Sequence, residues 1–115
     1  MRHSNTLALA ALAIGWSSSV ALAEVTWEED VRPILKTHCF HCHGEAGEKE
    51  SGLDLRLHRF VMQGGESGAA IVAGDAAKSL LLQRLVDGEM PPDMDKQLSA
   101  AEIDTIRQWI VAGAV

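Results

Sequence analysis

Apolar residues recur with helical spacing in two well-separated segments of the chain. In the first, Thr26 stands three residues before Glu29, which is the spacing of a helix-capping box, and an apolar helical face follows. Pro33 interrupts this segment because it lacks a backbone N–H, so the regular helix either begins near Asp30 or bends there. We expect this helix to end at the sequence HCFHCHG, residues 38–44.

The segment near the C-terminus has the clearest helical pattern. Ser99 and Glu102 form a second capping box, and Gly113 follows the last apolar position, as is common at helix ends. The apolar positions between them share one helical face: Ile103, Ile106, Trp109 and Ile110. This pattern predicts an amphipathic helix that buries one side.

A third helix is predicted over residues 76–87, capped by Asp75 and ended by Gly88. The sequence EMPPDMDKQ follows, and its two prolines exclude a continuous helix. These features add one short helix and one restrained, irregular segment.

The remaining connections are long for so short a chain. Residues 44–52 and 64–75 are rich in glycine and polar residues and are expected to be loops. Residues 53–57, LDLRL, alternate like a short strand, but no partner strand is evident, and a short helix over 58–63 is an equal alternative. The pattern therefore predicts an all-α fold of few short helices, with long loops that wrap around something.

The first residues have the order of a secretory signal peptide. Arg2 precedes a short apolar run at residues 7–14, and small residues lead up to Ala23. We expect cleavage after Ala23, which gives a signal peptide over 1–23 and one domain over 24–115, located in the periplasm or otherwise exported. The alternative is an uncleaved anchor.

The charge balance limits the partners of the exported chain. Removal of Arg2 with the signal leaves nine basic and sixteen acidic residues, a net charge of −7. An acidic surface disfavours nucleic acids and anionic membranes, and we expect no stable membrane insertion after cleavage. It permits docking to a basic protein surface.

Both cysteines of the chain stand in the sequence HCFHCHG. Cys39, Cys42 and His43 spell C-x-x-C-H, the attachment signature of c-type haem. Two thiols at this separation reach the two vinyl groups on one edge of the porphyrin, and the next imidazole is placed under the ring as the proximal iron ligand. We therefore expect one covalent haem c, which would also supply the apolar surface that a small chain lacks.

Three other interpretations of the cysteines have less support in the sequence. A zinc site needs about four ligands, so His38 or His58 would have to complete the set without a second C-x-x-C motif. A thioredoxin-like dithiol expects a βαβ setting, which the pattern does not contain. A plain structural disulfide is the third alternative.

An iron bound by His43 has a second axial position, and Met90 is the leading candidate for it. Met90 directly precedes two prolines, which restrict the backbone and so help to hold a weak thioether ligand. Histidine–methionine ligation raises the reduction potential and suits electron transfer. The competing ligands are Met94, whose acidic neighbours indicate exposure, and His58.

Three other residues receive no role in binding iron. Met62 falls where a small helix wants a core residue, so packing is its expected role. His38 and His41 are expected to be neighbours of the motif, with His41 near the haem edge and solvated.

The chain resembles the planctomycete-type cytochrome c domain, a branch of the class I cytochromes c. Four stretches carry the resemblance: VRPILKTHCFHCHG, GLDLRLHRFVMQGGESGAAIVAGD, KSLLLQRLVDGEMPP and LSAAEIDTIRQWIVAGA. The resemblance implies a class I fold around one haem c, with Cys39 and Cys42 as attachment sites, His43 as proximal ligand and Met90 as distal ligand. It also implies that Trp109 packs against the N-terminal helix and the haem.

The sequence departs from the family pattern in two ways. Ala69, Ala73 and Ala76 stand where the family often has prolines, so a looser middle connection is expected. Family members often carry this module at the head of larger proteins, whereas this sequence stops at Val115, so we expect a free-standing carrier of single electrons and no catalytic residues. The alternatives are a haem subunit or domain of a larger oxidoreductase, and a five-coordinate haem protein with peroxidase-like or gas-binding behaviour.

Overall fold

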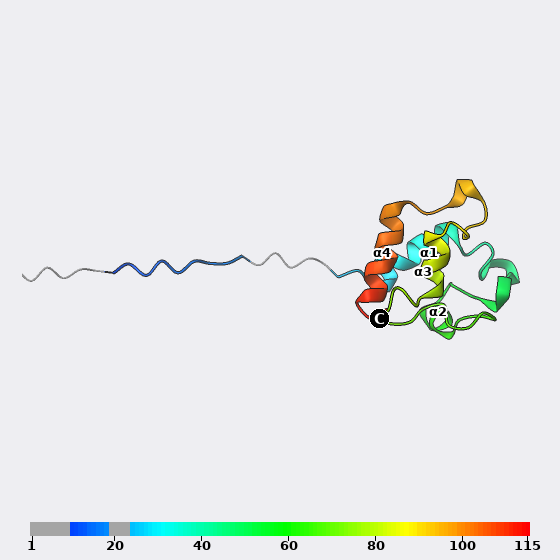
Figure 1. The fold of residues 1–115 in the computed structure, drawn as a ribbon, viewed down its shortest axis with the longest axis horizontal. Helices are drawn as coiled ribbons and strands as arrows, with labels where there is room; N and C mark the ends of the chain where they lie inside the picture. The colour runs from blue at the N-terminus through cyan, green and yellow to red at the C-terminus, as the bar shows by residue number, and fades with distance from the viewer. Residues whose placement is uncertain (1–9, 19–23) are drawn as a thin grey trace, which may run out of the picture.

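The computed structural model describes residues 10–18 and 24–115, and Figure 1 shows its course. Residues 10–18 have no regular secondary structure and are exposed, and the rest of the predicted signal segment lies outside the described residues. The elements follow in the order η1 (Trp27–Val31), α1 (Arg32–His38), η2 (Glu45–Gly47), η3 (Glu50–Gly52), α2 (His58–Gln63), α3 (Leu80–Val86), η4 (Met94–Lys96) and α4 (Ala100–Val111). The described residues form helices and no strand, in agreement with the all-α prediction.

The N-terminal helical segment is a π-helical turn, η1, that continues directly into α1. Thr26 Oγ1 accepts the N–H of Glu29 at 3.2 Å, as predicted. The capping box would have the Glu29 carboxylate accept the backbone N–H of Thr26. That N–H instead donates to the carboxylate of Asp30 at 2.7 Å, so this part of the prediction was wrong. Pro33 is the second residue of α1, and the regular α-helix begins at Arg32, directly after the π-helical turn.

The C-terminal helix α4 has the predicted boundaries and cap. The side chain of Ser99 accepts the N–H of Glu102 at 3.1 Å, and the Glu102 carboxylate accepts the N–H of Ser99 at 2.9 Å. Three of the four predicted apolar residues are buried: Ile106, Trp109 and Ile110. The helix ends before Gly113, whose φ of 113° suits glycine.

The prediction for the third helix was wrong at its start and right at its end. Asp75 closes a turn instead of capping a helix, and α3 begins only at Leu80. The fully buried Ser79 fixes this start, because its hydroxyl donates to the carbonyl oxygen of Asp75 at 2.8 Å. Gly88, with a φ of 72°, follows the helix end.

Residues 53–57 form no strand, so the alternating pattern was misleading there. The chain is extended at Leu53 and Leu57, and it enters helix α2 at His58. The alternation of apolar and polar residues does not match burial, because Asp54 and Leu55 are both buried whereas Leu57 is 40% exposed. The alternative of a short helix over 58–63 is confirmed.

An aromatic cluster joins the two ends of the domain. The ring centroids of Trp27 and Trp109 are 5.5 Å apart, and the ring of His58 lies 5.6 Å from the first and 5.8 Å from the second. The Nε2 atom of His58 is 2.7 Å from the carbonyl oxygen of Ala114. These contacts hold η1, α2 and the end of α4 together, and Figure 1 shows α4 beside α1.

We predict that Ser99→Ala lowers the free energy of unfolding by about 1 kcal/mol, because α4 loses its N-terminal side-chain acceptor. Chemical denaturation of the purified protein measures this effect. Thr105→Ala is the control, since this hydroxyl bonds only to the Ala101 carbonyl oxygen of the same helix. Equal destabilisation by both variants would contradict the role of the cap.

Candidate functional site

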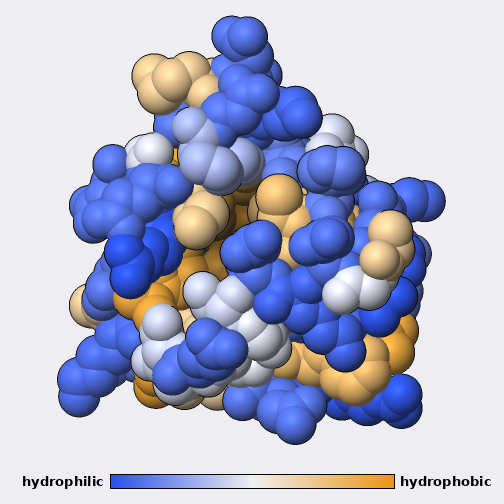
Figure 2. Space-filling model, turned by 90° about the vertical axis from the view of Figure 1, so that its right-hand side faces the viewer, coloured by the Kyte–Doolittle hydropathy of each residue, from blue (hydrophilic) through white to orange (hydrophobic). Residues whose placement is uncertain are grey.

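An apolar cavity of about 580 Å³ lies between α1 and α3. In Figure 2 hydrophobic residues are visible in a hollow of the surface that hydrophilic residues surround. Side chains from α1, residues 39–55, α3 and the proline segment form its walls, and no residue of α4 does. The apolar lining includes Leu35, Leu55, Ala70, Leu80, Leu81 and Leu85.

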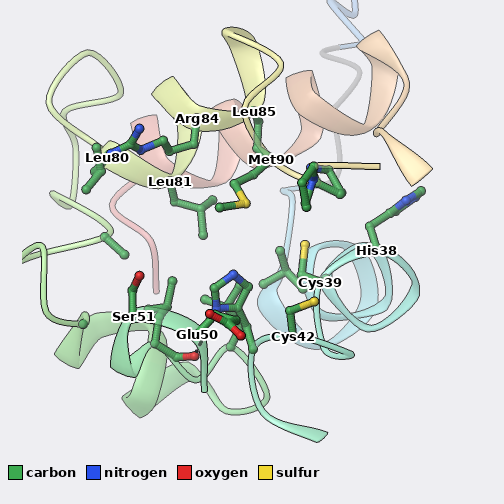
Figure 3. Close-up of a pocket in the computed structure, with 18 of the residues that line it drawn as sticks. His38, Cys39, Cys42, Glu50, Ser51, Leu80, Leu81, Arg84, Leu85 and Met90 are labelled. Atoms are coloured by element: carbon green, nitrogen blue, oxygen red, sulfur yellow. Dashed lines mark hydrogen bonds between the residues drawn. The ribbon is translucent and has the colours of Figure 1, made fainter. Parts of the chain in front are cut away.

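The three residues of the C-x-x-C-H motif all line this cavity. The N–H of Cys39 bonds to the Leu35 carbonyl oxygen at 2.8 Å, so the motif begins on the last turn of α1. A further turn brings the N–H of His43 to within 3.0 Å of the Cys39 carbonyl oxygen. Figure 3 shows the sulfur atoms of Cys39 and Cys42 side by side at the cavity wall.

The ring of His43 is oriented by a backbone acceptor. Its Nδ1 atom lies 3.3 Å from the carbonyl oxygen of Leu53, which can only accept, so Nδ1 carries the hydrogen. The other ring nitrogen, Nε2, then keeps its lone pair. Hydrogen bonding of one imidazole nitrogen in this way is the usual support of a metal-binding histidine.

An ion pair between the buried Asp54 and the largely exposed side chain of Arg56 holds the extended segment that supplies this acceptor. Asp54 is 5% exposed, and its carboxylate accepts the backbone N–H of Arg56 at 3.0 Å and the Nη2–H of the same residue at 2.8 Å. Hydrogen bonds from the Arg56 side chain hold the pKa of Asp54 below its usual value, against the opposing effect of burial. A Cβ at Gly44, where φ is +140°, would fall 2.6 Å from both side chains. Glycine directly after His43 therefore lets this pair pack against the motif.

Both cysteines are free thiols in the structure. Burial, with smaller contributions from Cys42 and Glu102, raises the pKa of the Cys39 thiol to about 12. Since the thiolate is the nucleophile in dithiol exchange, a protonated Cys39 does not favour the redox-pair interpretation. Within the described ranges 10–18 and 24–115, no three His, Cys, Asp or Glu side chains group closely enough to hold a metal ion, which leaves the zinc interpretation without a ligand set there.

The candidates for the second axial position lie in different surroundings. Met90 lines the cavity, and Figure 3 shows its sulfur pointing inward from the segment after α3. Met94 is 78% exposed and does not line the cavity, while His58 belongs to the aromatic cluster. Met62 packs against the core, which is the role predicted for it. Of these four residues, only Met90 can reach a group in the cavity from where it lies.

The structure departs from three sequence-based expectations around the site. Trp109 packs on Trp27, as the family resemblance implied, but it is not among the residues that line the cavity. His38 makes hydrogen bonds to two distant segments, although no role was predicted for it. Asp54 was not predicted at all, and only its position between two leucines could have indicated a buried carboxylate.

The donor atoms fit a covalently attached haem. Two thiols and an oriented imidazole stand on one wall, a thioether enters from another, and the remaining lining is largely apolar. A helical domain with this motif in an apolar cavity is a c-type cytochrome by class. The family model for planctomycete cytochrome C matches residues 39–94, from the first cysteine of the motif to four residues beyond Met90. Residues 39–94 are therefore similar to a planctomycete-type cytochrome c domain.

No curated protein and no solved structure matches the chain. None of the helices in the described part of the chain has the length and apolar character needed to cross a membrane. The family thus supplies the general function, that of a haem-binding electron carrier, and the finer assignment depends on the site itself.

We predict that Asp54→Asn destabilises the protein at pH 7 by roughly 1–3 kcal/mol, because charge-assisted hydrogen bonds from Arg56 are weakened. Folding lowers the pKa of this carboxyl group, so the group stabilises the fold at pH values above about 3.9, the pKa of aspartate in the unfolded chain. This contribution is lost as the pH falls through the folded pKa. The difference between wild type and variant should therefore shrink below about pH 4.

Denaturation curves collected across this pH range test the prediction. Asp104→Asn is the matched control, because Asp104 pairs with Arg107 on the exposed surface of α4. A wild-type/Asp54→Asn difference that stays constant from pH 7 to pH 3 would show that the charge of Asp54 does not contribute.

Proposed function

We propose that the protein is an exported mono-haem cytochrome c of the class I fold that transfers single electrons between redox partner proteins. The observation that carries this proposal is that Cys39, Cys42, His43 and Met90 line one apolar cavity, with Nδ1 of His43 engaged by a backbone carbonyl group. When bound, the haem supplies a reversible one-electron couple.

Each residue of the site has a defined task in this proposal. Cys39 and Cys42 would hold the haem through thioether bonds, in which each thiol adds across a vinyl group and its hydrogen goes to the other vinyl carbon. His43 would offer Nε2 to the iron, and Met90 would offer its sulfur atom. The leucines of the cavity wall would keep water away from these ligands.

The surface around the cavity supports a partner with a basic docking surface. Exposed acidic residues occur on the two segments that flank the opening: Glu45, Glu48 and Glu50 on one, and Asp87, Glu89, Asp93 and Asp95 on the other. Glu50 and Asp93 belong to the cavity lining itself, together with Arg84 and Lys96. A reduced partner would donate one electron here, and an oxidised partner would accept it, with steering by opposite charge.

We predict that the holoprotein is low-spin, with a methionine–iron charge-transfer band that Met90→Ala abolishes. The reduction potential of this variant should fall, because methionine ligation raises it. Visible spectra and potentiometric titration measure both quantities. Met94→Ala is the control and should keep the band, since Met94 is exposed and away from the cavity.

A high-spin wild-type protein would contradict the carrier proposal and favour the five-coordinate alternative. Covalent attachment has a separate test. Pyridine haemochrome analysis of protein produced with the haem-attachment machinery should show haem c, and replacement of both Cys39 and Cys42 by alanine should abolish it.

We also predict that the purified, exported protein begins at Glu24. The reason is the small-residue sequence ALA at positions 21–23, which fits a signal-peptidase site. N-terminal sequencing or intact mass of the holoprotein measures this. Met1 at the N-terminus of the purified holoprotein would favour the uncleaved anchor.

A further inference from the structure

We propose that His38 is a positioning residue for Met90, because it fastens the segment that carries this methionine to α1 and α4. The inference rests on the proposed function, in which Met90 binds the haem iron. His38 lines the cavity, and its side chain is 16% exposed. It stands directly before the first cysteine of the motif, at the end of α1.

Both ring nitrogens of His38 bond to parts of the chain that are distant in sequence. Nδ1 lies 2.8 Å from the carbonyl oxygen of Lys96, and Nε2 lies 3.0 Å from Oε2 of Glu102. These partners are 58 and 64 positions away. One imidazole therefore connects the haem-attachment turn, the segment after Met90 and the start of α4.

The two partners of His38 set its chemical form. A carbonyl oxygen only accepts hydrogen bonds, and so does an ionised carboxylate. Each of these bonds therefore needs a hydrogen on the ring nitrogen that makes it. The second oxygen of Glu102 accepts the N–H of Ser99 at 2.9 Å, which fixes the carboxylate within the helix cap. His38 is thus bound to a rigid anchor.

Among the described residues, the segment around Met90 is otherwise held mainly by burial of Pro91 and by the hydrogen bond from the N–H of Met90 to the Arg84 carbonyl oxygen at 3.2 Å. In the described part of the chain, the other hydrogen bonds of residues 91–97 stay within residues 88–97. Met90 itself is 39% exposed. The bond from His38 to Lys96 therefore ties this segment across the cavity to α1, six residues beyond Met90. Without that bond, the segment should move away from the cavity more readily and take the Met90 sulfur with it.

Displacement of the methionine by an external ligand measures this motion. Ferric holoprotein is titrated with imidazole while the methionine–iron band is followed. We expect His38→Ala to lower the apparent Kd of imidazole about tenfold, because a neutral and a charge-assisted hydrogen bond are lost. His38→Gln should lower the apparent Kd less, because the glutamine amide can still donate a hydrogen bond to one of the two acceptors.

Two variants of Glu102 separate the contribution of the His38–Glu102 bond from that of the His38–Lys96 bond. In Glu102→Gln, the amide N–H can donate to Nε2 of a neutral His38, while Nδ1–H still donates to Lys96, so an apparent Kd near wild type is expected. Glu102→Ala leaves only the bond to Lys96 and should lie between wild type and His38→Ala. A merely structural role of His38 gives no reason for this order.

His58→Gln is the matched control for a general loss of stability. His58 also bonds a distant carbonyl oxygen, that of Ala114 at 2.7 Å across 56 positions, but it does not line the cavity. It should lower the denaturation midpoint and leave imidazole affinity unchanged. Hydrogen exchange of residues 91–97 should rise in His38→Ala and not in this control.

The possible results are distinct. An imidazole Kd within twofold of wild type in His38→Ala, or an equal shift in His58→Gln, overturns the positioning role while the proposed function stands. A wild-type protein with covalent haem but no methionine band overturns the proposed ligand and this inference together. If His38→Ala yields no holoprotein, the comparison of His38→Gln with Glu102→Ala and Glu102→Gln decides.

Discussion

The hydrogen bond between Nδ1 of His43 and the carbonyl oxygen of Leu53 is the interaction on which the site depends. It fixes the ring of His43, the last residue of the C-x-x-C-H motif, and leaves Nε2 available. The carbonyl group stays in place because Asp54 and Arg56 hold the next residues, and this ion pair packs beside Gly44. The motif thus works through a segment ten residues downstream that contains no metal-binding residue of its own.

The sequence predicted the helices whose own residues determine them. α4 has its cap, apolar face and terminating glycine in one continuous stretch, so its limits were predictable. The start of α3 was not, because it depends on Ser79, which is buried among groups that only the tertiary fold brings together. Residues 53–57 misled for the same reason: the contacts that bury both Asp54 and Leu55 come from the tertiary fold and not from a partner strand.

The residues of the site divide in the same way into those that the sequence could predict and those that it could not. The spacing of the motif predicted Cys39, Cys42 and His43 as haem-binding residues, and the structure places all three at one cavity. The proximity of Met90 to them was expected from its proline context, and the structure places it in the same cavity. The partners of His38 were not predictable, since Lys96 contributes only its backbone oxygen and Glu102 looked like an ordinary capping residue. Backbone acceptors leave no signature in a sequence.

The two walls of the cavity lie far apart along the chain, with the attachment motif in the first half of the domain and α3 and Met90 in the second. In the proposed export through its N-terminal segment, the chain would emerge in that order. Its cysteines would then reach the far side of the membrane while the residues that cover them are still behind. Translocation in this direction would give the attachment machinery access to both thiols before the second wall of the cavity closes.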